Sequence, residues 1–106
     1  MKIYGKNFDD FNHLEKRLFS VDMKLLIWSN RISKEQMMEV VCERMEIVSK
    51  ILGISFSKSF SGSEFMSVAR KVESSNYSVL KFTKDLEISS KQGYRLIGTK
   101  VSTGVN

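Results

Sequence analysis

The sequence predicts a small all-α protein, and three observations support this fold class. Apolar residues recur at alternating spacings of three and four in two long stretches, which is typical of amphipathic helices. Serine-led capping boxes precede several of the predicted helices. Proline is absent from the 106 residues, so nothing in the chain forbids long helices. The length suits a single domain, which we place at residues 1–106.

The first half of the chain predicts a helical hairpin over residues 8–53. Asp9 and Asp10 are suited to the start of its first helix because acidic residues favour a helix N-terminus. A polar turn around residues 30–31 separates the two helices. The first apolar stripe consists of Phe11, Leu14, Leu18, Val21, Leu25, Trp28 and Ile32. The second stripe consists of Met38, Val41, Met45, Val48 and Leu52.

Capping signals set the ends of the second helix of this hairpin. Ser33 and Gln36 form a capping box at its start, and Gly53 is a suitable C-terminal stop. In an α+β alternative, residues 23–29 and 54–60 are strands, since Ile54, Phe56 and Phe60 alternate with polar residues. The unbroken heptad register favours the helices.

The second half, residues 61–97, predicts three further helices. Ser61 and Glu64 form a capping box before a helix whose apolar face runs from Phe65 to Val72. After a break at residues 74–76, Ser78 caps a second helix. Ser89 and Gln92 form another capping box, which opens a helix through about residue 97. The tail at residues 98–106 is expected to be loosely held.

The last two of these helices form a predicted helix-turn-helix. Phe82 and Leu86 face the core, Ile88 fills the turn, and Ser89 caps a recognition helix that enters the major groove. Arginine, lysine and glutamine are side chains that reach base edges, and lysines on the preceding helix can hold phosphates. The predicted DNA-binding residues are Ser90, Lys91, Gln92, Tyr94 and Arg95 on the recognition helix, with Lys81 and Lys84 on the bracing helix.

Residues 65–97 resemble the second helix-turn-helix of AraC-type transcription activators. Residues 65–72 resemble the linker helix of that family, residues 75–78 its break, and residues 86–89 its turn. Glu87 stands where the turn usually carries glycine, and Gly93 stands where an apolar residue usually anchors the recognition helix. The resemblance covers about a third of the chain and implies binding of double-stranded DNA.

The same C-terminal segment also allows a β-hairpin. In that alternative, residues 77–88 and 94–103 are strands joined by a loop at residues 89–93. The apolar residues Leu80, Phe82, Leu86 and Ile88 all occupy even-numbered positions, so they would point to the same face of a strand.

Charge favours an anionic partner. The net charge is +5: residues 1–53 carry 9 basic and 8 acidic residues, and residues 54–106 carry 8 and 4. We therefore expect a DNA-binding transcriptional regulator, a homodimer through the heptad stripes, and no enzymatic activity. One alternative is a metal-independent ribonuclease with a four-stranded sheet, because residues 93–96 resemble a strand opening in RelE-like toxins. Another is a protein-interaction module such as a chaperone, immunity or inhibitor protein.

The sequence offers no recognisable catalytic, metal or cofactor site. His13 and Cys42 are single residues far apart, without the spacing that fixes a metal ion. His13 is expected on the solvated side of the first helix, and Cys42 to be buried or half-buried. A lone cysteine suits a cytoplasmic protein. The longest apolar run, residues 25–28, is far too short to span a membrane.

Overall fold

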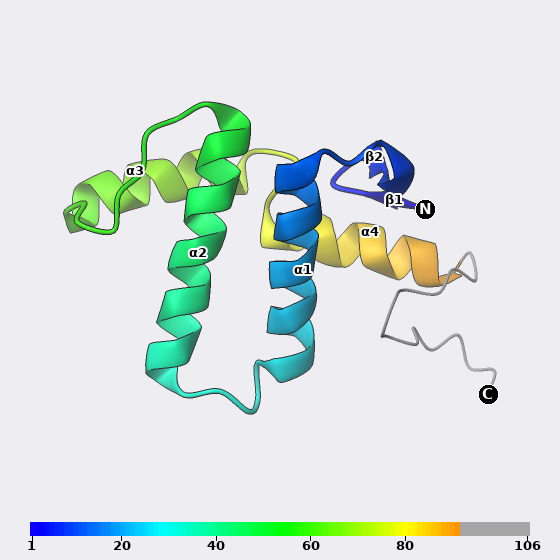
Figure 1. Ribbon diagram of the computed structural model, residues 1–106, viewed down its shortest axis with the longest axis horizontal. Helices are drawn as coiled ribbons and strands as arrows, with labels where there is room; N and C mark the ends of the chain where they lie inside the picture. Colours follow the sequence, from blue (N-terminus) through cyan, green and yellow to red (C-terminus); the bar gives the residue numbers. More distant parts are fainter. Residues whose placement is uncertain (92–106) are drawn as a thin grey trace.

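The computed structural model describes residues 1–91, which form a mostly helical protein with one small β-hairpin (Figure 1). The predicted all-α class is confirmed. The elements are β1 (Lys2–Ile3), β2 (Lys6–Asn7), a short 3-10 turn (Phe8–Asp10), α1 (His13–Trp28), α2 (Lys34–Leu52), α3 (Gly62–Glu73) and α4 (Val79–Lys91). The predicted tail at residues 98–106 lies outside the described residues.

Helices α1 and α2 form the predicted antiparallel hairpin, with minor changes at its start. Asp9 and Asp10 do not begin α1, because they belong to the 3-10 turn before it. The true N-cap is Asn12, whose side chain accepts a hydrogen bond from the Glu15 backbone while the Glu15 carboxylate accepts one from the Asn12 backbone. This capping box makes α1 begin at residue 13.

The predicted ends of α2 are confirmed. Ser33 and Gln36 form the expected capping box, and Gly53 ends the helix in the left-handed conformation, with φ of 70°. The α+β alternative is wrong, because residues 23–28 belong to α1 and residues 54–60 contain no strand.

The apolar stripes are buried at one end of the hairpin and exposed at the other. Leu18 and Val48 are completely buried, whereas Trp28 is 44% exposed and Met38 is 56% exposed. Figure 1 shows the reason: α3 crosses α2 and α4 crosses α1 away from the α1–α2 turn, so no helix within residues 1–91 covers the turn end. We call the covered end the base of the hairpin and residues 24–40 its tip.

The N-terminal β-hairpin, formed by β1 and β2, anchors α4 to the base of the helical hairpin. Tyr4 and Gly5 have φ of 59° and 73°, as a two-residue type I′ turn between β1 and β2 requires. The Tyr4 ring is buried and lies 5.8 Å, between centroids, from both Phe11 and Phe82. Helix α4 packs on β1 through the face that carries Phe82.

The predicted turn of the helix-turn-helix at residues 86–89 is wrong, because α4 continues through it to Lys91. Ser89 is not an N-cap: it is buried inside α4, and its hydroxyl donates to the carbonyl of Lys2 at 3.5 Å. With Phe82 and Leu86 it extends a single helical face against β1. Ile88 does not fill a turn either, since it is 52% exposed.

Two other C-terminal expectations also change. Residues 79–88 are helical, so the first strand of the β-hairpin alternative is absent, and its second strand, at residues 94–103, lies outside the described residues. The sheet of the ribonuclease alternative is absent from residues 61–91, which contain α3 and α4 instead. None of the helices within residues 1–91 combines the length and apolar composition that crossing a membrane requires.

Candidate interaction site

The predicted DNA-binding residues do not form a recognition helix in the described structure. Gln92, Tyr94 and Arg95 lie outside the described residues. Ser90 and Lys91 belong to the last turn of α4, where Ser90 is partly buried and Lys91 is exposed.

The three predicted lysines on α4 differ in what they contact. The ammonium of Lys81 lies 3.0 Å from an Asp85 carboxylate oxygen, and that of Lys91 lies 3.2 Å from Glu87, both one helical turn away. Lys84 is exposed and forms none of the ion pairs found within residues 1–91. Lys84 is therefore the predicted phosphate-binding residue most available to an anion.

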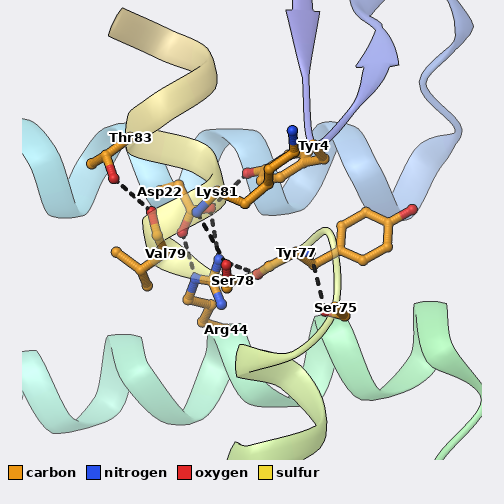
Figure 2. Close-up of polar contacts among 9 residues, drawn as sticks. All are labelled: Tyr4, Asp22, Arg44, Ser75, Tyr77, Ser78, Val79, Lys81 and Thr83. Carbon is orange, nitrogen blue, oxygen red and sulfur yellow. Dashed lines mark hydrogen bonds and ion pairs between the residues drawn. The ribbon is translucent and has the colours of Figure 1, made fainter.

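A buried polar network, which the sequence did not reveal, holds the base of the hairpin together (Figure 2). Arg44 of α2 donates from Nε to Asp22 of α1 at 2.7 Å and from Nη2 to the other Asp22 oxygen at 3.1 Å. Its Nη2 also donates to the backbone carbonyl of Tyr77, in the linker between α3 and α4. The Tyr4 hydroxyl donates to Asp22 at 2.6 Å. One carboxylate thus joins α1, α2 and the N-terminal hairpin.

Glu15 forms a second junction at the base. Its carboxylate accepts hydrogen bonds at 2.9 Å from the Lys6 ammonium, the Asn12 backbone and the Tyr77 hydroxyl. Burial opposes ionisation of Glu15, but these hydrogen bonds, led by that from Asn12, hold its pKa below the ordinary value. Burial and the bond to Glu15 raise the pKa of Tyr77 to about 12.

Asp22 and Arg44 are structural, because a ligand cannot reach them. Asp22 is 2% exposed and Arg44 is 4% exposed. Burial, and next the neighbouring Asp22 carboxylate, raise the pKa of the Tyr4 hydroxyl far above its ordinary value, so Tyr4 stays protonated as a donor. The network fixes the base and leaves the tip as the accessible part of the hairpin.

The tip carries four large apolar side chains that are exposed to solvent. Leu26, Ile27 and Trp28, the last three residues of α1, are 48%, 45% and 44% exposed. Met38 of α2 is 56% exposed. Successive helix positions point in different directions, so these side chains surround the end of α1 and do not form one flat patch. Together they make the tip a candidate interaction surface.

A groove of about 350 Å³ lies in the tip between the end of α1 and the start of α2. Its lining is mostly apolar and includes side chains of both charges. The lining residues are Lys24, Leu25, Trp28, Ile32, Gln36, Glu39 and Val40. The Arg31 guanidinium lies 5.7 Å from the centre of the Trp28 ring, a cation–π distance that orients this ring beside the groove.

Two charged side chains that line the groove form no ion pair within residues 1–91. Lys24 and Glu39 line the same groove, yet neither takes part in the ion pairs found in that part of the chain. Glu35, Glu39 and Glu43 follow one another at four-residue spacing along α2, so each adds to the negative potential of the next. The groove therefore presents a basic and an acidic side chain that have no ion-pair partner within residues 1–91.

His13 and Cys42, for which the sequence predicts no catalytic or metal-binding role, have the exposure that we expected. His13 is exposed at the start of α1, and Cys42 is half-buried on α2. Within residues 1–91, no group of three or more His, Cys, Asp or Glu side chains is placed to hold a metal ion.

Comparisons with protein-family models, curated proteins and solved structures found no match to this chain.

Proposed function

We propose that this protein is a protein-interaction module that binds a partner polypeptide through the tip of its helical hairpin. The observation that carries the proposal is the exposure of Leu26, Ile27, Trp28 and Met38 together at one end of a rigidly held hairpin. Tryptophan, methionine and arginine are enriched in the cores of protein interfaces, and tryptophan is prominent among the residues that dominate binding energy.

The division of the hairpin into base and tip supports this function. The base is fixed by the buried pair of Asp22 and Arg44, so the tip is held in place before a partner arrives. Binding to a preorganised surface avoids much of the entropy that is lost when a flexible segment becomes ordered. Trp28, beside the groove, is the natural anchor for a partner side chain or helix.

Site-specific photo-crosslinking in cells that express the protein tests this proposal. A photoreactive amino acid at Ile27, in the tip, should give a discrete protein adduct that mass spectrometry identifies. The matched control places the same group at Lys16, which is exposed on α1 near the base. Equal adducts from both positions, or none from position 27, would contradict binding at the tip.

A second candidate function is the binding of double-stranded DNA through the outer face of α4. The observation that favours it is the exposed position of Lys84, which forms none of the ion pairs found within residues 1–91, in a chain of net charge +5. Since α4 continues through the expected turn, its lysines suit contacts with phosphates, which bind DNA without distinguishing sequence. This candidate therefore replaces a base-reading helix with a phosphate-binding one.

Salt-dependent binding of a DNA duplex tests this candidate. Lys84→Ala should weaken binding to all duplexes alike and reduce the salt dependence by about one unit, as expected for one lost phosphate contact. Lys91→Ala should have a smaller effect, because Lys91 is already paired with Glu87. Arg95→Ala tests the contribution of residues beyond 91. Parental affinity in all three variants at low salt would eliminate DNA binding.

A further inference from the structure

The charges around the groove are self-complementary. Lys24 lies four residues before the end of α1, and Glu39 lies five residues after the start of α2. Because a helix rises 1.5 Å per residue, the two side chains stand at nearly the same height above the α1–α2 turn. They belong to opposite helices of the hairpin and carry opposite charges.

A two-fold axis along the hairpin would satisfy both charges at once. When two hairpins face each other across such an axis, α1 of each lies opposite α2 of the other. Lys24 of one copy then faces Glu39 of the second copy, and the same pair occurs a second time by symmetry. The grooves of the two copies also face each other, so the Trp28 side chains lie within the contact.

We propose that the partner of the tip is a second copy of this chain, and that the two hairpins form a four-helix arrangement paired groove to groove. This inference rests on the proposed interaction function and identifies the partner that binds the tip. Leu25, Trp28, Ile32 and Val40 supply the apolar centre, and Lys24 with Glu39 fix the orientation at the edge. Interfaces of this kind combine an apolar core with a polar rim.

The dimer is expected to be weak and dependent on concentration. A stable interface usually uses about 20–30 residues from each partner, which is more than residues 24–40 provide. A dissociation constant on the order of micromolar is therefore expected. Trp28 is the chain's single tryptophan, so its fluorescence reports directly on burial of the groove. Its emission should shift to shorter wavelength as the protein concentration rises.

Charge reversal provides the decisive experiment, with mass measured by sedimentation equilibrium. Lys24→Glu alone places two glutamates opposite each other, and Glu39→Lys alone places two lysines opposite each other. Each single variant should dissociate about tenfold more readily than the parent. An equimolar mixture of the two variants should recover dimer, because every facing pair is again one acid and one base. Lys16→Glu, on the exposed part of α1 near the base, is the matched control and should dimerise like the parent.

The outcomes separate this inference from the function on which it rests. A parent chain that stays at 12.2 kDa at high concentration overturns the second copy as partner. In that case, crosslinking of a different protein to position 27 would still support the proposed function as a protein-interaction module. A dimer that the single reversals leave intact, or that their mixture fails to restore, overturns the groove-to-groove arrangement. Dissociation by Lys16→Glu would also overturn it. Helical circular dichroism of each variant checks that the fold is retained.

Discussion

Removing the buried guanidinium of Arg44 should destabilise the protein more than any loss of a surface ion pair. Arg44→Met keeps an unbranched side chain but deletes both bonds to Asp22 and the bond to the Tyr77 carbonyl. The Arg44 and Asp22 side chains are only 5% and 2% exposed, so the variant leaves a carboxylate buried without its counter-charge. Breaking such a pair typically costs about 3–5 kcal/mol. The whole free energy of unfolding of a small domain is only about 5–15 kcal/mol.

Urea unfolding followed by far-ultraviolet circular dichroism measures this loss, and the midpoint should fall by about 2 M. Arg44→Met combined with Asp22→Asn should recover part of the loss, because the buried charge is gone while the Tyr4 hydroxyl keeps an acceptor. The control is Lys58→Ala, which removes an exposed pair with Glu46 at 3.8 Å and should cost less than about 1 kcal/mol. If Arg44→Met costs no more than this control, the network does not hold the base.

Three other changes test separate parts of the fold. Leu18→Asp, at a fully buried position, should lower the free energy of unfolding by about 2–5 kcal/mol in the same urea assay. Val41→Asp, at a half-buried position, should lower it less. Parental midpoints for both variants would refute the heptad packing. Gly53→Ala should cost about 1 kcal/mol because φ is 70° there, although no neighbour would contact the new methyl group; an unchanged midpoint would contradict that backbone conformation. The pKa of Glu15 is lower in the folded state than its ordinary value of 4.5, so Glu15 stabilises the protein above that pH and the contribution disappears on acidification. The difference in stability between the parent and Glu15→Gln should accordingly shrink as the pH falls below about 4, and a difference that grows would refute the assignment.

The helical hairpin could be predicted from sequence because its signals are local. Ser33 with Gln36 and Gly53 act within one or two helical turns, and the structure confirms both ends of α2. The capping box of Asn12 and Glu15 was equally local, and the motif was visible in the sequence. It was missed because Asp9 and Asp10, just before it, offered a competing helix start.

The turn expected at residues 86–89 failed for a different reason. Ser89 has the side chain of an N-cap, and only its environment decides whether it acts as one. In the structure, β1 covers that side of α4, and a small serine there permits close packing and bonds to the Lys2 carbonyl. Ion pairs from Lys81 to Asp85 and from Lys91 to Glu87 also favour an unbroken helix.

The sequence by itself determined the helical class, the hairpin and most helix boundaries, since capping and apolar periodicity depend on residues a few positions apart. It also placed Trp28 and Met38 in the apolar stripes. Only the tertiary structure decided that, within residues 1–91, these stripes are covered at the base and exposed at the tip, because coverage depends on where α3 and α4 cross the hairpin. The pairing of Asp22 with Arg44 likewise joins residues 22 positions apart on separate helices, a contact that no local pattern encodes.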